Sequence, residues 1–355
     1  MPLSRRGFLR ALSALGALSP FRPSAQAAST GPGSSAYPLS DHFDGKRFFN
    51  PNGNQPRGFG DLLRWQFGRK QGPWPESVAN TASPDLPATL GAGECAVTFV
   101  GHATFLLQFA GLNVLTDPIW SERCSPFSWA GPKRVRPPGI AFEALPRIDL
   151  VLLSHNHYDH LDLPTLQRLH AAHRPLIVTT LGNRPFLADE GIDHVVELDW
   201  WQTHAVRPDV RVTITPAQHF AARGLGDRFE TLWGGFALET PAGKIWFAGD
   251  SGYFDGFEAI GTRLGPFDLA FIPIGAYEPR WFMEPVHCTP AEAIRIHREA
   301  QSRRSVAMHF GCFPLADDGF EQPVTDFRAA QAAAGLAPEA FTLPEVGATQ
   351  RYRFS

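Results

Sequence analysis

Short apolar runs separated by polar and turn residues recur along the chain from residue 95 onwards, and each run predicts a β-strand. Residues 95–100 predict one strand, and residues 104–109 and 113–116 predict a hairpin around Gly111. Residues 149–153 form a continuous apolar run, which is typical of a strand buried on both faces. Further strands are predicted at residues 176–180, 194–198, 211–216, 233–239, 244–248, 269–273 and 305–309.

Helices are predicted at three places. Leucines at positions 163, 166 and 169, with Pro164 near the start, predict a helix over residues 163–169. Residues 290–301 predict another helix, and residues 60–67 predict a third within an otherwise irregular region, 41–90, that is rich in Pro, Gly and aromatics. Early hairpin strands followed by strands alternating with helices predict an α/β fold with two mixed β-sheets flanked by helices.

The N-terminus has the order of a secretory signal. Arg5 and Arg6 precede an apolar stretch at residues 11–18, and the small-x-small triplet 25–27 follows. The arginine pair indicates the bacterial twin-arginine (Tat) route, so residues 1–27 are predicted to be a Tat signal peptide and the mature protein to be periplasmic or secreted. Residues 28–40 are predicted to be a flexible linker, and residues 41–355 the folded domain with an N-terminal wrap at 41–90.

Composition narrows the class of protein. Hydrophobic residues make up 43% of the 355 residues and charged residues 19%, as in a globular domain. The formal net charge of −3 argues against a nucleic-acid partner. The four cysteines form no Cys-x-x-Cys pair; one disulfide is compatible with export, without an assignment of its partners. A homodimer is compatible with the sequence.

Three histidines and an aspartate lie within residues 155–160. His155 and His157 are two apart, so on an extended segment their side chains point the same way and reach one metal ion. Asp159 and His160 come where the chain turns into the predicted helix, and they face a second metal nearby. Imidazole and carboxylate ligands suit zinc first, with manganese, iron or nickel as alternatives.

Three later polar residues each follow an apolar strand: His219, Asp250 and His309. Each of them alone is more often a hydrogen-bonding residue at a strand end. Together with the 155–160 cluster, they make four strand ends that supply ligands to one edge, which is how a sheet scaffold builds a site.

The pattern His155-x-His157-x-Asp159-His160 with these later residues resembles the ligand set of the metallo-β-lactamase superfamily. The resemblance implies an αββα sandwich and two Zn²⁺ per chain, with Mn²⁺ or Fe²⁺ as alternatives. It further implies that one zinc is held by His155, His157 and His219 and the other by Asp159, His160 and His309, with Asp250 as the bridge.

Segments 101–104, 116–118, 216–219, 232–235 and 274–283 are similar to one branch of the superfamily, the phospholipases D that hydrolyse N-acylphosphatidylethanolamine. The similarity runs from about residue 42 to the C-terminus. It implies that Tyr158 and His287 touch the phospholipid. Two alternatives stay open: Tyr158 orders the metal loop, and His287 supports a ligand or lies at the surface.

These observations predict a zinc-dependent hydrolase that cleaves a phosphodiester in phospholipids of the N-acylphosphatidylethanolamine type. A metal-bridged hydroxide attacks phosphorus. Asp159 and Asp250 are the predicted catalytic carboxylates, and His287 steadies the phosphate or protonates the leaving group. The predicted partners are a phospholipid or other phosphodiester substrate and a peripheral membrane contact.

Three other functions compete with this one. A lactonase or other ester hydrolase uses the same metal chemistry, and a non-catalytic metal- or lipid-binding protein keeps the scaffold without turnover. A redox di-iron site is disfavoured, because His157 stands where redox relatives usually carry an acid. The apolar residues Trp200, Trp201, Trp281, Phe282 and Met283 form either a surface for acyl chains or part of the core.

Overall fold

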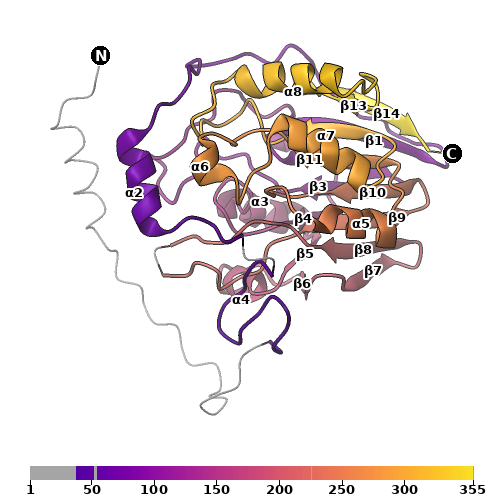
Figure 1. The fold of residues 1–355 in the computed structure, drawn as a ribbon. Helices are drawn as coiled ribbons and strands as arrows, with labels where there is room; N and C mark the ends of the chain where they lie inside the picture. The colour runs from indigo at the N-terminus through magenta and orange to yellow at the C-terminus, as the bar shows by residue number, and fades with distance from the viewer. Residues whose placement is uncertain (1–36, 52–53, 225, 355) are drawn as a thin grey trace. The chain divides into compact units, whose positions relative to one another are not determined.

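Two seven-stranded sheets pack face to face in the computed structural model, which describes residues 37–51, 54–224 and 226–354 (Figure 1). Residues Leu39–Ser355 form one compact unit. The predicted signal peptide, 1–27, and most of the predicted linker, 28–40, lie outside the described residues. Within the described part of the chain, no helix has the length and apolarity needed to cross a bilayer.

The first sheet has the strand order β14-β1-β2-β3-β4-β5-β6. Strands β1 to β3 pair antiparallel through tight hairpins, and β3 to β6 run parallel. The bounds are β1 (Glu94–Gly101), β2 (Thr104–Phe109), β3 (Leu112–Thr116), β4 (Leu150–Leu153), β5 (Leu176–Thr180), β6 (Val195–Leu198) and β14 (Thr349–Arg353). All four residues of β4 are buried, as its continuous apolar run predicted.

The second sheet has the order β13-β12-β11-β10-β9-β8-β7 and the same division into two parts. Strands β7 to β10 pair antiparallel, and β10 to β13 run parallel. The bounds are β7 (Thr203–Arg207), β8 (Val210–Thr215), β9 (Gly235–Thr240), β10 (Gly243–Phe247), β11 (Leu269–Pro273), β12 (Ser305–Met308) and β13 (Phe341–Thr342).

Helices cover the outer face of each sheet, so the predicted αββα arrangement is confirmed (Figure 1). On the first sheet, α4 (Asn183–Asp189) packs against β5 and β6, and α3 (Leu163–His173) contributes leucines to the core beside β4. On the second sheet, α7 (Pro290–Glu299) packs against β11, and α5 (Gly256–Leu264) and α8 (Gln322–Ala333) pack against α7.

Aromatic residues join the two sheets in the core. The ring of Phe105 on β2 lies 4.5 Å from that of Phe271 on β11, and both side chains are fully buried. Two tilted rings of this size remove a large apolar area from water, and burying one such side chain contributes roughly 1.5–3 kcal/mol. The sheets therefore share one hydrophobic core.

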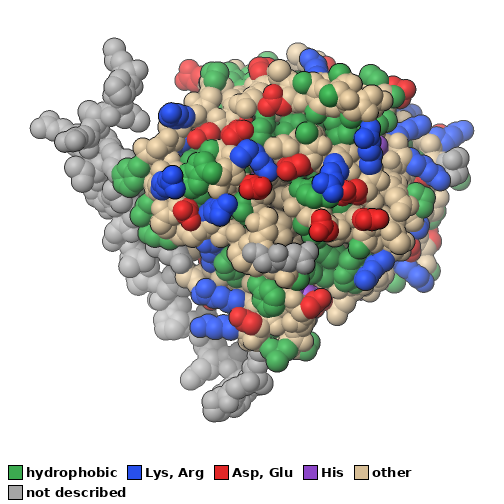
Figure 2. All heavy atoms as spheres, viewed as in Figure 1, with side chains coloured by type: hydrophobic (Ala, Val, Ile, Leu, Met, Phe, Trp, Pro, Cys, Tyr) green, Lys and Arg blue, Asp and Glu red, His purple; other side chains and the backbone are tan. Residues whose placement is uncertain are grey.

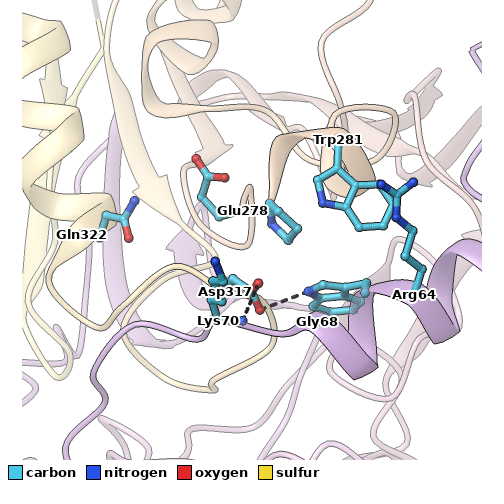
Figure 3. A pocket seen from close by; sticks show the side chains of 9 residues that line it. Arg64, Gly68, Lys70, Glu278, Trp281, Asp317 and Gln322 are labelled. Carbon is cyan, nitrogen blue, oxygen red and sulfur yellow. Dashed lines mark hydrogen bonds between the residues drawn. The ribbon is translucent and has the colours of Figure 1, made fainter.

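The helix predicted at residues 60–67 is α2 (Phe59–Gly68), which lies beside α6 (Arg280–Met283). The indole Nε1 of Trp65 donates to Oδ1 of Asp317 across 3.0 Å, and the backbone N–H of Lys70 donates to Oδ2 of the same carboxylate. The guanidinium of Arg64 lies 4.9 Å from the ring of Trp281 (Figure 3). These contacts fix α2 on the domain.

All four cysteines are buried free thiols, so no disulfide forms among them. Burial raises the pKa of the Cys95 thiol to about 12, which makes it inert near neutral pH. The sequence was compatible with one disulfide, and the structure contains none among these four cysteines.

Candidate metal centre

The candidate metal centre lies at one edge of both sheets, where several strands end. Strands β3 and β4 run parallel, so Asp117 and His155, which follow them, emerge at the same edge. On the second sheet, Asp250 follows β10 and His309 follows β12, and these strands run parallel to the β11 between them. The seven ligands predicted from the sequence are therefore brought together.

His155, His157 and His219 form the first group of converging imidazoles. Nε2 of His155 lies 2.9 Å from Nδ1 of His157, which lies 3.2 Å from Nε2 of His219. His219 donates from Nδ1 to the backbone carbonyl of Val286 across 2.8 Å, which directs Nε2 into the group. Three imidazole nitrogens around one point are a usual zinc donor set.

Asp159, His160 and His309 form the second group, together with His102. Oδ2 of Asp159 lies 3.3 Å from Nε2 of His160 and 3.3 Å from Nε2 of His309. Each member offers a ligand atom within 4.8 Å of the others. This mixed set of nitrogen and oxygen donors suits a divalent transition metal.

Asp250 lies between the two groups. Its Oδ2 is 3.1 Å from Nε2 of His160, 3.0 Å from Nε2 of His309 and 3.9 Å from Nε2 of His219. Its Oδ1 is buried and has no hydrogen-bond partner among the described residues. A buried carboxylate oxygen without a partner is costly, and a cation at this position removes the cost. The donor set thus fits two metal ions.

The three histidines of the first group are neutral near pH 7, as metal ligands must be. Burial lowers the pKa of His155 well below its usual value, that of His157 to about 3 and that of His219 to about 4. Neutral imidazoles present free lone pairs, which metal binding requires. The protein therefore holds this group ready to bind a cation at neutral pH.

The second group is dominated by its carboxylates. Burial alone lowers the pKa of His160 and His309, but Asp250 and neighbouring acids outweigh it, so the pKa of His309 rises to about 9. Burial also opposes ionisation of Asp250, yet the charges of His160 and His309 hold the pKa of that carboxyl well below its usual range. A metal ion supplies the positive charge that protonated histidines supply here without it.

Asp117 supports the centre from behind. Its Oδ2 accepts from Nδ1 of His160 across 2.7 Å and from Oγ of Ser154 across 2.6 Å, and its Oδ1 accepts from the backbone N–H of Ser154. Oγ of Ser154 also lies 2.9 Å from Nδ1 of His155. One carboxylate therefore orients a ligand in each group, which is a common way to fix imidazole ligands.

His102 was not predicted as a site residue. It lies in the β1–β2 turn at a φ of 58°, 2% exposed, with Nε2 3.0 Å from Oδ2 of Asp159. Its backbone carbonyl accepts from the N–H of His309 across 2.8 Å. Asp117, likewise missed, directly follows β3, so the strand-end rule used for His219, Asp250 and His309 would have found it.

Gly275 allows the chain to approach His309 closely. A Cβ atom at position 275 would lie 2.1 Å from the carbonyl oxygen of His309, far inside van der Waals contact. Only glycine fits there without moving the backbone that presents this ligand.

A cavity of about 400 Å³ leads to the metal ligands. At one end it is lined by His157, Asp159, Asp250 and His287. The remaining wall is largely apolar and comes from α2, α6 and neighbouring loops, with Phe59, Leu62, Trp65, Phe220, Phe282, Met283, Val286 and Leu315 among its residues. A largely apolar pocket with polar groups at one end suits an amphiphilic ligand.

The predicted substrate residues occupy different places. His287 lines this cavity, and its ring lies 5.2 Å from those of His219 and His309. Tyr158 lines a separate cavity and lies under Arg223, whose guanidinium is 4.0 Å from its ring. Arg223 also donates to the carbonyls of Asn156 and Leu161, which ties down the metal loop. Both substrate roles remain predictions.

The aromatic residues considered for acyl chains separate in the structure. Phe282 and Met283 line the cavity, but Trp200 is buried elsewhere, where its ring stacks 4.2 Å from that of His42. Trp201 carries the guanidinium of Arg263 on its ring and does not line the cavity. Trp200 and Trp201 thus belong to other packing regions.

Comparison with known proteins gives one family match. Residues 112–310 match the family described as "Beta-lactamase superfamily domain". The chain is 42% identical over 228 residues to an N-acyl-phosphatidylethanolamine-hydrolyzing phospholipase D 1 of Caenorhabditis elegans, and 33% identical over 259 residues to a mitochondrial protein of that activity from Saccharomyces cerevisiae. These alignments cover 61% and 71% of this chain.

The chain spans less than two thirds of either phospholipase, 64% of the first and 55% of the second. Among solved structures, an isothiocyanate hydrolase from Delia radicum gut bacteria aligns with a TM-score of 0.59 at 20% identity. That alignment covers 73% of this chain and 99% of the other, and at this identity it supports the fold alone.

Proposed function

Because this chain belongs to the β-lactamase superfamily, and to its metal-dependent hydrolases, we propose that it cleaves the phosphodiester of phospholipids of the N-acylphosphatidylethanolamine type. The observation that carries the proposal is the apolar cavity that ends at the metal ligands and His287. An acyl-bearing diester places its phosphate at the ligands and its apolar part along the wall. The identity to two phospholipases D supports this substrate class.

Two zinc ions, when bound, supply a hydroxide nucleophile near neutral pH and offset negative charge on the phosphoryl oxygens. The proposed holders of one ion are His155, His157 and His219, and those of the other are Asp159, His160 and His309. Asp250, within 3.9 Å of ligands from both groups, is the proposed bridge. Asp117 keeps the imidazole of His160 in one orientation.

His287 is the proposed contact to the phosphate. Burial lowers its pKa well below the usual value, so the imidazole is neutral at pH 7 and offers one N–H and one lone pair. Its Nδ1 is buried without a hydrogen-bond partner among the described residues, so no protein group there holds the ring in one tautomer. A hydrogen bond from this ring steadies the phosphate or the departing alkoxide.

We further propose that α2 contacts a lipid surface. Phe59, Leu63 and Phe67 are spaced four residues apart and are 63%, 42% and 71% exposed, and Trp281 on α6 is 40% exposed. Figure 2 shows hydrophobic and basic side chains side by side on this face. Phe59 also lines the cavity, so a lipid bound by this stripe lies next to the entrance.

The test is an assay of the metal-analysed protein against N-acylphosphatidylethanolamine, simple phosphodiesters and a panel of lactones. The proposal expects release of an N-acylethanolamine and phosphatidic acid, loss of turnover with a chelator and recovery with zinc. Hydrolysis of lactones alone would overturn the phosphodiester assignment, and a metal-loaded protein without any turnover would favour the non-catalytic alternative. Full activity in a metal-loaded His157→Ala variant would contradict the ligand assignment.

Export by the Tat route is a separate proposal, and it rests on the N-terminal sequence pattern. Substituting Arg5 and Arg6 by lysine is expected to retain the precursor inside the cell. Cell fractionation with immunoblotting checks this, and unchanged export of the double variant would contradict it.

A further inference from the structure

Arg228 lies in the loop between β8 and β9 and lines the cavity that leads to the metal ligands. Its guanidinium carbon is 4.9 Å from the ring of Phe220 and 4.8 Å from that of Phe229. The ring of Phe220 in turn lies 4.5 Å from the imidazole of His157. The guanidinium is therefore two ring contacts away from a proposed metal ligand.

This guanidinium has no acidic partner among the described residues. Its Nη2 donates to the backbone carbonyl of Arg57 across 2.7 Å, and its Nε is buried without a hydrogen-bond partner. Burial lowers the pKa of Arg228, and no nearby charge offsets it. Arg228 is half-buried, so its guanidinium has lost part of its water without gaining an acidic partner, and an anion in the cavity would supply that partner.

Two other buried arginines, Arg223 and Arg134, differ from Arg228 because neighbouring groups partly offset their loss of water. Burial also lowers the pKa of Arg223, but Tyr158, Asp162 and Asp227 act in the opposite direction. Arg134 is likewise balanced in part, by Cys312, Asp162 and Cys124, and three backbone carbonyls accept from it. Both serve the packing of loops. Arg228 makes one backbone contact and faces the cavity.

The acids of the cavity are already committed. Among the lining residues, Asp159 and Asp250 are the only carboxylates, and both belong to the metal ligands. Arg57 lines the same cavity, and its Nε donates to the backbone carbonyl of Trp281 across 2.9 Å, again without an ion pair. Two unpaired guanidinium groups thus lie along a wall that is otherwise mostly apolar.

We propose that Arg228, assisted by Arg57, binds an acidic group of the substrate other than the diester held at the metal ligands. The inference rests on the proposed phosphodiester function and makes it narrower. The preferred substrates are phospholipid diesters whose head group carries a second anionic oxygen group, a carboxylate or a phosphoryl group. The guanidinium fork can donate two parallel hydrogen bonds to the oxygens of either group.

Binding is tested with three soluble probes that the enzyme cannot cleave. They are glycerol monoesters of 2-aminoethylphosphonate, N-acylated with a pentanoyl, a glutaryl or a 3-phosphonopropanoyl group. All three carry the phosphonate anion; the second adds a carboxylate and the third a phosphoryl acid. Calorimetric titration of the zinc-loaded protein is expected to show at least one acidic probe binding about tenfold more tightly than the pentanoyl probe.

Variants assign that preference to its residue. R228Q is expected to remove most of the preference while leaving the affinity for the pentanoyl probe within about twofold. R228K keeps the positive charge but lacks the planar guanidinium, so its preference for acidic probes is expected to lie between those of wild type and R228Q. If R228Q folds poorly, R228K still tests the role of the guanidinium. R263Q is the matched control, because Arg263 also lies on an aromatic ring, that of Trp201, outside the cavity.

Equal binding of the three probes by the wild-type protein overturns the inference, and so does a preference that survives in R228Q. Hydrolysis of N-glutaryl- and N-pentanoyl-phosphatidylethanolamine is measured in parallel. A preference for acidic probes without hydrolysis of either lipid would leave the anion site standing and contradict the proposed function. Hydrolysis of the lipids without a preference for the acidic probes would support the proposed function and contradict the anion site.

Discussion

The imidazole Nδ1 of His160 lies 2.7 Å from Oδ2 of Asp117, and both side chains are fully buried. Asp117 follows a strand of the first sheet, and through His160 it determines how a ligand of the second metal group is oriented. Asp117 is thus a positioning residue for the proposed ligand His160.

Asp117→Asn keeps the size of the side chain but removes its charge. We expect metal affinity to fall by roughly 10–100-fold, because an amide NH₂ cannot accept all the hydrogen bonds that this carboxylate accepts. Metal content after dialysis against graded chelator concentrations measures the effect. An unchanged chelator midpoint in a well-folded variant would show that His160 needs no support from Asp117.

His102→Ala is expected to weaken the second metal group selectively. The variant loses the imidazole that lies 3.0 Å from Oδ2 of Asp159, so this carboxylate gains freedom to rotate. Metal content should drop towards one ion per chain, and His102→Gln, which keeps an N–H donor, should retain more. Two tightly held ions in His102→Ala would refute this role.

The histidine pKa values predict that the metal-free protein is most stable near pH 6.5. Burial lowers the pKa of four histidines to about 4 or about 3; these are His102, His157, His219 and His297. The unfolded chain therefore binds protons more readily than the folded one, and stability falls as the pH drops from 6.5 towards 4. The pKa of His309 is raised to about 9 by Asp250 and Asp159 against burial, so its contribution is present below pH 6.5 and lost as the pH rises through 9.

Urea unfolding in the presence of a chelator, followed at several pH values, measures this dependence. The urea midpoint should decline on both sides of pH 6.5. A midpoint that rises steadily from pH 6.5 to pH 4 would contradict the burial of these neutral imidazoles.

The α2 surface is expected to bind vesicles through its exposed phenylalanines. Burying one Phe side chain contributes roughly 1.5–3 kcal/mol, so the double variant of Phe59→Ser and Phe67→Ser should bind vesicles of phosphatidylethanolamine and phosphatidylglycerol more than tenfold more weakly. Phe127→Ser, at a residue 41% exposed outside this helix, is the control. Cosedimentation measures the binding, and equal losses in both variants would argue for a non-specific effect.

Much of the fold could be predicted because its central strands are apolar along their whole length. The prediction for residues 149–153 matches β4 within one residue, and that for 269–273 matches β11. Strands β7 and β14 were missed, because each lies at a sheet edge and carries polar residues such as Thr203 and Arg351. Helix α8 was missed for a related reason, since it buries only Pro323 and Phe327.

The proposed ligands could be found from the sequence because the 155–160 loop, His219, Asp250 and His309 each come shortly after an apolar strand, and strand ends gather at one edge. The supporting residues were harder to find. His102 acts from a turn at a positive φ, and its contact with Asp159 joins residues 57 positions apart. Arg228 lies in no recognisable sequence motif. It could be singled out only from the structure, which places its guanidinium in the cavity wall without an acidic partner among the described residues.

The two metal groups draw their residues from both sheets, since the 155–160 loop follows β4 whereas His219, Asp250 and His309 follow strands of the other sheet. Bound ions would therefore act as cross-links between two halves that are otherwise held by apolar packing and by a few hydrogen bonds, such as that from the N–H of His309 to the carbonyl of His102. The proposed ligands lie together only while the two sheets are packed, so an opening between the sheets would be expected to release the metal and to stop the proposed reaction at the same time. Metal occupancy thus reports the docked state of the whole sandwich.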